Sequence, residues 1–214
     1  MKIIGIVHGK GGVGKSTIAV NVSRSLQLRG LDVAIIDCDA QGTSQDWKAS
    51  GDSDRLPAVY AVGKPGALRS SVQQLDKAFD VAVIDGGGQL QQMHAEIIKT
   101  SDLVLIPVQP SPADIWPTEK IVELIRARQS VVGAPEAAFV VSRRKTGTRL
   151  GKGVQDILER FELPVWDGTC DRVAYPKAMG RGISVVEMDD AKAASEVEAI
   201  SDNIIATLTK SGDS

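Results

Sequence analysis

The fold of this chain is decided by Gly9-Lys10-Gly11-Gly12-Val13-Gly14-Lys15-Ser16-Thr17. This stretch satisfies the pattern G-x-x-x-x-G-K-[ST], which predicts a loop wrapped around phosphate groups. Glycines allow consecutive backbone N–H groups to turn toward phosphate oxygens, where a side chain would collide. In this pattern Lys15 places its charge beside the β- and γ-phosphates, and the hydroxyl of Ser16 is a ligand for Mg²⁺.

The segments that flank this stretch favour the same interpretation. Ile3–Val7 before it is a short apolar run, and Thr17–Leu28 after it repeats apolar residues at helical spacing. A phosphate loop needs a strand before it and a helix after it, because the free N–H groups and the positive dipole end of the helix then face the anion. A glycine-rich turn with a surface lysine is the alternative, and it does not require this setting.

Apolar runs of this kind recur along the chain and alternate with helical patterns. Runs that are apolar throughout are typical of parallel strands buried on both faces. We therefore expect one α/β domain, residues 1–209, with a single doubly wound, mostly parallel sheet of the P-loop NTPase type flanked by helices, and a frayed tail, residues 210–214. Residues 49–65 are expected to form loops around a short element. The further runs are Val33–Ile36, Val81–Ile84, Leu103–Ile106 and Phe139–Val141, and the further helical patterns are Thr118–Arg128, Gly153–Phe161 and Ala191–Leu208.

Composition narrows the class of protein. Of the 214 residues, 43% are hydrophobic and 24% are charged, a balance typical of a folded globular protein. The two cysteines, Cys38 and Cys170, show no CxxC spacing, and we expect both to be reduced thiols. No apolar run reaches membrane-spanning length or has the form of a signal peptide, so we expect a cytoplasmic protein.

Acidic residues stand at the ends of two predicted strands. Asp37 and Asp39 follow Val33–Ile36, and Asp85 follows Val81–Ile84. Ligands of open parallel sheets lie outside the carboxyl ends of the strands, so we expect these acids beside the phosphate loop. There Asp85 would hold a Mg²⁺-bound water. Capping of a following helix is the other explanation for Asp37 and Asp39.

Lys10 introduces a family resemblance. The run Lys10–Thr17, KGGVGKST, resembles the deviant Walker A loop of the ParA/MinD superfamily. Later segments, among them Leu105–Ser111 and Phe139–Arg143, resemble the superfamily too, so that the likeness extends from Lys2 to about Glu187. It is closest to small ParA proteins that lack an N-terminal helix-turn-helix domain. Three of these segments are motifs. These motifs are Asp37-Cys38-Asp39-Ala40-Gln41-Gly42, Arg172-Val173-Ala174-Tyr175 and Gly182-Ile183-Ser184-Val185.

The resemblance implies a role for each site residue. Lys10, Lys15 and Asp39 would be catalytic, with Lys10 reaching the nucleotide of a dimer partner and Asp39 orienting the attacking water. Ser16 would ligate Mg²⁺, and Asp37 and Asp85 would reach it through water. Ser142 stands where relatives often carry an asparagine that reads adenine, which leaves recognition of the base open. The nucleotide-binding residues would be Gly9, Lys10, Gly11, Gly12, Val13, Gly14, Lys15, Ser16, Thr17 and Arg143.

Positive charge is concentrated in one segment. The net charge of −2 argues against a protein that coats nucleic acid by bulk charge, but Val141–Arg181 carries nine basic and five acidic residues. The resemblance implies an ATP-bound homodimer that binds DNA non-specifically, associates with the nucleoid, and works with a ParB-like or cargo-adaptor protein. A solvated basic face is the plainer explanation of the same charges. The DNA-binding candidates are Arg144, Lys145, Arg149, Lys152, Lys177 and Arg181.

Two other functions stay open. A MinD-like membrane-associated positioning ATPase would end in a basic amphipathic helix, whereas the helical pattern after Glu187 is mostly acidic, so we expect no membrane partner. A P-loop kinase or ligase acting on a small molecule would hydrolyse ATP only with its acceptor and would ignore DNA. An iron–sulfur electron carrier needs two suitably placed cysteines, and Cys38 lies inside the acidic segment instead.

Overall fold

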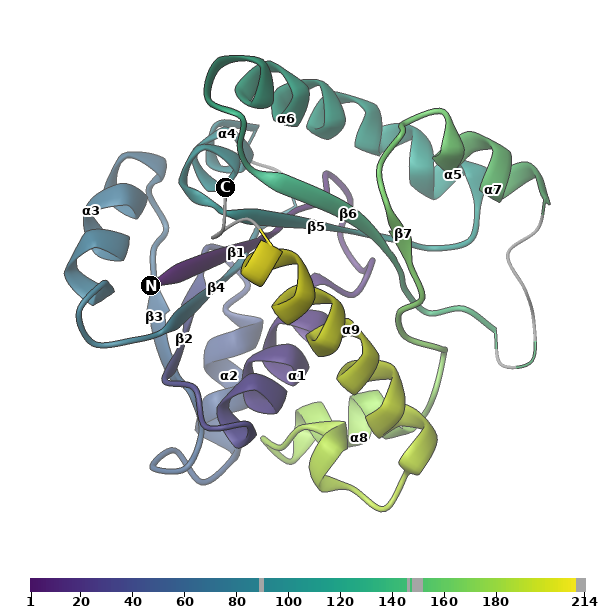
Figure 1. Cartoon of the computed structure of the whole chain (residues 1–214). Coiled ribbons are helices and arrows are strands. Elements are labelled where there is room, and N and C mark those ends of the chain that lie inside the picture. Colours follow the sequence, from purple (N-terminus) through teal and green to yellow (C-terminus); the bar gives the residue numbers. More distant parts are fainter. Residues whose placement is uncertain (89–90, 146, 148–151, 211–214) are drawn as a thin grey trace.

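The computed structural model describes residues 1–88, 91–145, 147 and 152–210. Within these residues one sheet of seven strands forms the middle layer of the molecule (Figure 1). Its strands are β1 (Lys2–Ile6), β2 (Val33–Asp37), β3 (Ala58–Ala61), β4 (Val81–Asp85), β5 (Leu103–Val108), β6 (Glu136–Val141) and β7 (Val165–Trp166). Their order across the sheet is β3-β2-β4-β1-β5-β6-β7, and every recorded pairing is parallel. The predicted doubly wound α/β fold is therefore confirmed.

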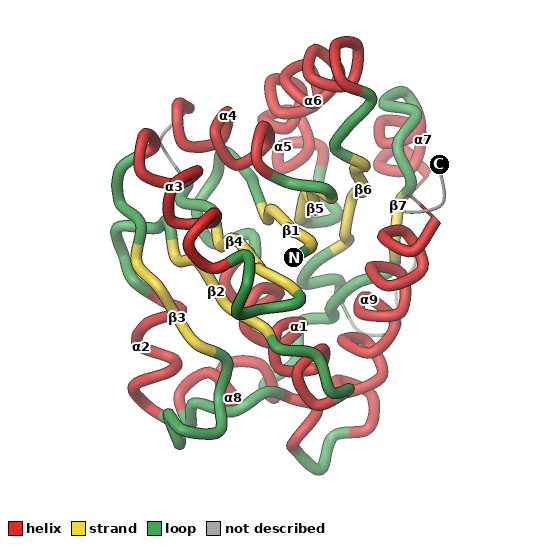
Figure 2. The backbone as a smooth tube through the Cα atoms, turned by 60° about the vertical axis from the view of Figure 1, so that its left-hand side comes forward, coloured by secondary structure: helices red, strands yellow, loops and turns green. Residues whose placement is uncertain are grey.

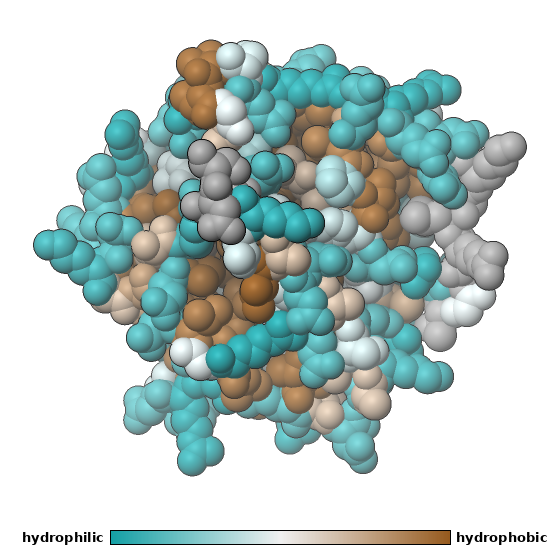
Figure 3. Space-filling model, in the orientation of Figure 1, coloured by the Kyte–Doolittle hydropathy of each residue, from teal (hydrophilic) through white to brown (hydrophobic). Residues whose placement is uncertain are grey.

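Helices cover both faces of this sheet, as the views in Figures 1 and 2 show. They are α1 (Lys15–Leu28), α2 (Thr43–Ser50), α3 (Pro65–Leu75), α4 (Gln91–Thr100), α5 (Pro112–Ile115), η1 (Trp116–Thr118), α6 (Glu119–Val132), α7 (Lys152–Glu159), α8 (Ala174–Gly180), η2 (Val185–Glu187) and α9 (Ala191–Lys210). One apolar cluster joins the sheet to α3, α4, α5, α6 and α7, and a second joins it to α1 and α9. On the face drawn in Figure 3, hydrophilic side chains surround smaller hydrophobic areas.

The continuous apolar runs are explained by burial on both sides. Every residue of β2, β4 and β5 is buried. In β2, Ile36 packs into the cluster with α3 and α4, whereas its neighbour Ile35 packs against Trp47 of α2. Each such side chain contributes about 1.5–3 kcal/mol when fully buried. Both faces of these strands must therefore be apolar, and no alternation is left to see in the sequence.

The strand order brings the loop after β1 and the predicted acids to one edge. β1 lies between β4 and β5, and Ile6 is level with Asp85 of β4. Asp37 at the end of β2 is level with the same Asp85. Parallel strands end on the same side, so the carboxyl ends of β1, β2 and β4 meet where the phosphate loop begins.

Several elements differ from the expected boundaries. The first helix starts at Lys15, two positions before the predicted Thr17, because the left-handed Gly14 is its N-cap. α6 continues to Val132 and ends where Gly133 turns left-handed. Residues 49–65 contain the edge strand β3, and the strand β7 was not predicted. α9 includes Lys210, which was assigned to the tail; the remaining residues of that tail lie outside the described part.

The segment around α8 and η2 folds back on α1 and α2. The buried Asn21 of α1 donates to the backbone oxygen of Thr17 at 2.8 Å and accepts hydrogen bonds from Ser184 Oγ and Val185 N, both at 2.8 Å. The Trp47 ring N–H of α2 donates to the backbone oxygen of Ile183 at 3.0 Å. These bonds give the Gly182–Val185 motif a structural role next to the phosphate loop. No helix in the ranges given above is long and apolar enough to cross a membrane.

Candidate nucleotide-binding site

The loop between β1 and α1 has the conformation that its glycines make possible. Gly12 (φ 77°) and Gly14 (φ 97°) both adopt left-handed backbone angles, which a side chain would strain. Since α1 begins immediately after Gly14, the N–H groups of its first turn belong to the loop itself. This arrangement is suited to an anion of several negative charges.

Lys15 lies at the centre of the site. Only 5% of its surface is exposed, and its ammonium donates to the backbone oxygen of Lys10 at 3.1 Å. Burial lowers the pKa of Lys15, while the carboxylates of Asp85 and Asp39 act in the opposite direction. The structure therefore brings the predicted lysine and two of the predicted acids into one electrostatic group.

Asp85 is fully buried, and one of its two carboxylate oxygens accepts no recorded hydrogen bond in the described part of the chain. Its Oδ2 accepts a hydrogen bond from Ser44 Oγ at 2.7 Å, whereas Oδ1 has no hydrogen-bond partner within the described residues. Burial raises the pKa of Asp85 to about 7, against the lowering effects of the Ser44 and Ser16 hydroxyls and of Lys15. A buried carboxylate oxygen without a partner, next to Ser16, fits a hydrated Mg²⁺ ion.

The metal site would not be a cage made by the protein alone. No group of three or more His, Cys, Asp or Glu side chains that could hold a metal occurs in the parts of the chain that the structure describes. Mg²⁺ typically keeps several waters and takes one or two carboxylates together with phosphate oxygens. The predicted ligands Ser16, Asp37 and Asp85 are consistent with that mode of binding.

Asp37 and Asp39 have different surroundings. Asp37 is buried and accepts hydrogen bonds from Asp39 N (3.0 Å), Gln45 N (3.3 Å) and Gln45 Nε2 (3.4 Å). Since Gln45 lies in the first turn of α2, the helix-capping explanation holds in part for Asp37. Burial raises the pKa of Asp37, and these hydrogen bonds oppose that rise. The carboxylate of Asp39 accepts one recorded bond, from Gln41 N at 3.0 Å, and Asp39 lines the cavity that contains the phosphate loop.

Close packing requires a glycine at position 86 and leaves little room for a side chain at Gly87. A side-chain carbon on Gly86 would lie 2.6 Å from the backbone oxygen of Ile6, and one on Gly87 would lie 3.1 Å from that of Cys38. The same carbon on Gly88 would approach Gly11 N at 3.4 Å. The segment thus runs between the strand that precedes the phosphate loop, the acidic segment and the loop itself. Because these segments are in close contact, a side chain added at Gly86 or Gly87 would have to displace a neighbouring segment.

Two histidines complete the site and were not predicted. His8 is buried, and its Nδ1 accepts a hydrogen bond from Lys10 N at 2.9 Å. His94 Nε2 lies 2.7 Å from the backbone oxygen of Gly87, and burial lowers the pKa of His94. A neutral His94 would donate to this oxygen. They are the two histidines of the chain, and the position of His8 directly before the loop was the available signal.

Ser142 supports the phosphate loop. Its hydroxyl is buried and donates to the backbone oxygen of Val13 at 2.6 Å. The adjacent Arg143, with a left-handed φ of 51°, donates from Nη1 to the oxygen of Gly12 at 3.2 Å. Arg143, which was predicted to bind the nucleotide, lines the same cavity as the loop, whereas Ser142 is not among the lining residues.

The cavity that contains the phosphate loop is lined by a second segment of the chain as well. It has a volume of about 720 Å³ and is bounded on its far side by the segment that leads into α8. The residues of this far wall are Thr169, Cys170, Asp171, Arg172, Val173, Tyr175, Pro176 and Met179. Apart from the Arg172–Tyr175 motif, no residue of this wall was predicted from the sequence.

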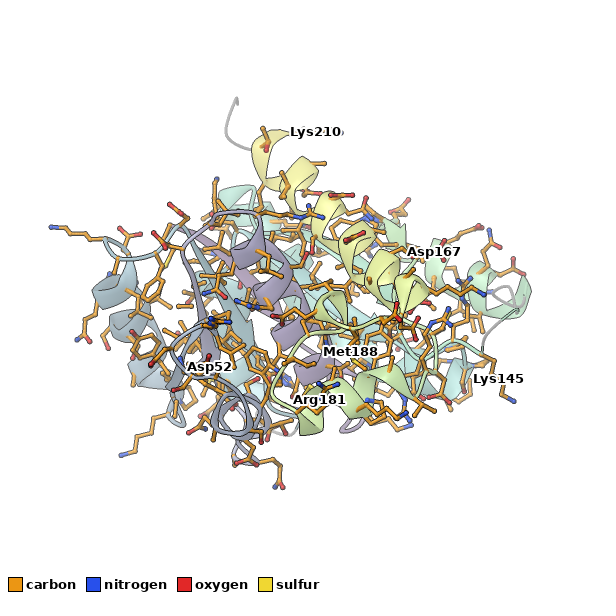
Figure 4. The ribbon with its side chains drawn as sticks, turned by 90° about the horizontal axis from the view of Figure 1, so that it is seen from below. Asp52, Lys145, Asp167, Arg181, Met188 and Lys210 are labelled. Carbon is orange, nitrogen blue, oxygen red and sulfur yellow. The ribbon has the colours of Figure 1, made fainter. Side chains whose placement is uncertain are left out.

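The six DNA-binding candidates do not form one uniform group. Arg144 pairs with Asp167 at 3.4 Å and is mostly covered. Lys145 follows β6, while Lys177 and Arg181 belong to α8 and its C-terminal end; all three are exposed, and Figure 4 labels Lys145 and Arg181. The side chains of the other two candidates are not described. These candidates are Arg149, which lies outside the described residues, and Lys152, of which only the backbone is described.

Comparison with known proteins identifies the family of the chain. Residues 4–185 match the family model of the CobQ/CobB/MinD/ParA nucleotide binding domain. The chain is 28% identical to the maintenance of carboxysome distribution protein A of Halothiobacillus neapolitanus, over 94% of this chain and 95% of that protein.

Two solved structures share the fold. MinD from Pyrococcus horikoshii with Mg-ADP superposes with a TM-score of 0.78 at 18% identity, covering 95% of both chains. An ATP complex of a McdA variant from Cyanothece gives 0.77 at 17% identity, covering 95% of this chain and 96% of that one. Because the family model spans the phosphate loop, both acidic segments and the far wall, the chain belongs to the CobQ/CobB/MinD/ParA family of nucleotide-binding domains.

Proposed function

We propose that this chain is a ParA/MinD-type positioning ATPase. It binds ATP with Mg²⁺, forms a homodimer in that state and binds DNA without sequence preference. A ParB-like or cargo-adaptor protein then stimulates hydrolysis, so that a cargo is positioned or segregated. The protein would be cytoplasmic and associated with the nucleoid while ATP is bound.

One observation carries this proposal. Lys15, Asp39 and Asp85, which come from three separate segments, form one electrostatic group beside a loop that also contains Lys10. Phosphoryl transfer to water depends on positioning and charge neutralisation more than on covalent chemistry. A lysine in the loop, a carboxylate for water and a buried carboxylate for the metal supply these functions.

Each residue has a task in this scheme. The backbone of Gly9–Thr17 would bind the triphosphate, and Lys15 would neutralise the β- and γ-phosphates. Asp39, whose carboxylate accepts one recorded bond and which lines the cavity of the phosphate loop, would orient the attacking water. Ser16 would ligate Mg²⁺ directly, and Asp37 and Asp85 would do so through water.

The remaining assignments concern the metal, the dimer and the sugar–base end of the nucleotide. When bound, Mg²⁺ neutralises charge that develops on the phosphates. Lys10 would reach the nucleotide of a second copy of the chain, in keeping with its place in the exposed part of the loop. Arg143 would contact the nucleotide from the strand end of β6.

DNA binding would rest on the exposed cations. Lys177 and Arg181 have no recorded ion pair among the described residues, and Lys145 lies in the exposed loop after β6. Arg144, Arg149 and Lys152 belong to the same proposed surface, although Arg144 is partly neutralised by Asp167. Contacts of lysine and arginine with phosphate give sequence-independent, salt-sensitive binding, and a dimer doubles their number.

The proposed cargo role draws on the relatives. The protein of H. neapolitanus that covers nearly this whole chain is named for the distribution of carboxysomes, which supports a function in positioning a large assembly. The Aquifex aeolicus MinD structure determined as a complex with MinC supports work through a partner protein. Both names describe those proteins, and the cargo of this chain is left to experiment.

Retention on DNA tests the proposal. Purified protein is passed over immobilised non-specific duplex DNA with ATP, with ADP and without nucleotide, at a series of salt concentrations. Binding only with ATP, and weakening steeply with salt, is expected. If the protein hydrolyses ATP but no nucleotide state binds DNA, the DNA-based proposal is wrong, and liposomes and small-molecule acceptors become the next substrates to test.

A further inference from the structure

Four hydrogen-bond donors converge on the carboxylate of Glu196 in α9. Its Oε1 accepts from Arg172 Nε at 2.8 Å and from Arg172 Nη2 at 2.7 Å. Its Oε2 accepts from Cys170 N at 2.9 Å and from the Tyr175 hydroxyl at 2.8 Å. Such a set of charge-assisted bonds fixes both the position and the orientation of the groups that donate them.

All three donor residues line the cavity of the phosphate loop. Cys170, Arg172 and Tyr175 belong to its far wall, whereas Glu196 itself is not among the lining residues. On its other side the wall is held by backbone bonds to the end of β6, from Arg144 N to Thr169 O at 3.0 Å and from Asp171 N to Arg144 O at 2.8 Å. The wall is thus clamped between Arg144 and Glu196.

The clamp is protected from water. The side chains of Arg172 and Glu196 are 17% and 13% exposed. Burial alone would raise the pKa of Glu196, but the bonds from Arg172, Cys170 and Tyr175 outweigh it and lower that pKa. A neutral amide in place of the carboxylate would weaken the pairing with Arg172 and leave poorly satisfied donors in the wall.

The wall must meet the part of the nucleotide that the phosphate loop does not hold. With the phosphates at Gly11–Thr17, and with Asp39 near Lys15 and Arg143 at Gly12, the part of the cavity lined by the wall is left for the ribose and the base. Ser142, the residue at the expected adenine-reading position, is occupied by the loop oxygen of Val13. Recognition of the base therefore falls to the wall that Glu196 holds.

We infer that Glu196 is a positioning residue that sets the ribose-and-base wall of the nucleotide site through Cys170, Arg172 and Tyr175. This inference rests on the proposed function, since it assumes that a nucleoside triphosphate is the ligand. It makes the affinity for the base depend on a helix that does not touch the nucleotide. Phosphate binding, in contrast, is independent of Glu196.

Calorimetric titration with two ligands tests this inference. ATP carries phosphates, ribose and base, whereas tripolyphosphate carries the phosphates alone, and both are titrated with Mg²⁺ into the full chain. Glu196→Gln is expected to weaken ATP binding about tenfold while tripolyphosphate binding stays unchanged. Glu196→Asp keeps the charge but shortens the reach, so a smaller loss for ATP alone is expected, and this variant serves if the glutamine variant does not fold.

The control and the opposing outcomes are distinct. Glu198→Gln changes the same residue type two positions along α9, where the side chain is exposed, and should alter neither affinity. If the Glu196 variants weaken the binding of ATP and of tripolyphosphate equally, or change neither, Glu196 does not set the ribose-and-base wall and the inference is wrong. If the wild-type chain does not bind ATP, the proposed function fails, and the inference falls with it.

Discussion

The side-chain ammonium of Lys15 donates a hydrogen bond to the backbone oxygen of Lys10, while the backbone N–H of Lys10 donates to His8 Nδ1. The two loop lysines therefore contribute in different ways. Lys15 acts through its charged side chain, whereas the recorded bonds of Lys10 to the loop use its backbone, which alanine retains. This difference separates the effects of replacing them.

Lys15→Ala is expected to abolish ATP binding, and Lys10→Ala to leave ADP binding largely intact while blocking hydrolysis. Removal of Lys15 leaves the carboxylates of Asp39 and Asp85 without their common cation in a site that must accept a triphosphate. Titration with ADP and ATP, together with a phosphate-release assay, distinguishes the two variants. Normal turnover by Lys10→Ala would contradict the assignment of that lysine.

Asp39→Ala is expected to stop hydrolysis and to trap the ATP-bound dimer without unfolding the chain. The carboxylate of Asp39 accepts one recorded bond, so little folding free energy is lost. Asp37→Ala makes the contrast, because it removes a buried acceptor of three bonds and should lower the free energy of unfolding by about 1–3 kcal/mol. Size-exclusion chromatography with ATP and denaturant unfolding measure these effects. Wild-type turnover by Asp39→Ala would show that another group orients the water.

Gly86→Ala is expected to destabilise the chain by about 1–3 kcal/mol, because its new carbon would lie 2.6 Å from the backbone oxygen of Ile6. Gly66→Ala is the matched control: it lies in α3 with nothing within 4 Å of the added carbon, and should be neutral or slightly stabilising. Urea unfolding of both variants gives the comparison. Equal stabilities would mean that the segment after Asp85 can move aside at little cost.

The success of sequence reasoning depended on the range of the interactions. The phosphate loop and the acids at the ends of β2 and β4 were recognisable because strand, loop and helix follow one another in the chain. The far wall was not recognisable in this way, since the hydrogen bond between Cys170 and Glu196 joins residues that are 26 positions apart. Ser142 and Val13, 129 positions apart, show the same limit. Only the tertiary fold decides that this serine supports the loop instead of the base.

Short elements could not be predicted from the sequence for a related reason. β7 has two residues, too few for any periodic pattern to show, and it exists because its strand pairs with β6. Ser44, which donates to Asp85, lies in a polar helix start that has no distinctive motif. The acidic residues at the strand ends could be proposed as site residues from the sequence, whereas the groups that hydrogen-bond to them could not.

The Lys177→Gln/Arg181→Gln variant is expected to weaken ATP-dependent DNA binding and to reduce the salt dependence by about one unit of slope per lost phosphate contact. ATP binding should be unchanged, because neither residue lines the nucleotide cavity. The control Lys99→Gln/Lys120→Gln removes the same charge from α4 and α6, on the other side of the sheet. If both variants lose DNA binding equally, net charge and not the α8 surface determines the affinity.

Acid sensitivity is expected where η2 meets α1. Arg24 Nη2 pairs with Glu187 Oε1 at 2.6 Å, and Glu187 Oε2 also accepts from Ser184 N at 3.0 Å. Burial would raise the pKa of Glu187, but Arg24 and Ser184 outweigh it and lower that pKa. A group whose pKa is lowered by folding stabilises the fold above its unfolded pKa, about 4.3 for glutamate, and this contribution is lost as the pH falls through the lower, folded value.

Glu187→Gln should therefore cost about 1 kcal/mol of unfolding free energy at neutral pH, since the amide can still accept from Ser184 but no longer pairs as an anion with Arg24. The difference between wild type and variant should shrink below about pH 4 and vanish once the wild-type carboxyl is protonated. Urea unfolding at a series of pH values measures this difference. A difference that stays constant down to low pH would mean that packing, and not the ion pair, joins η2 to the phosphate-loop helix.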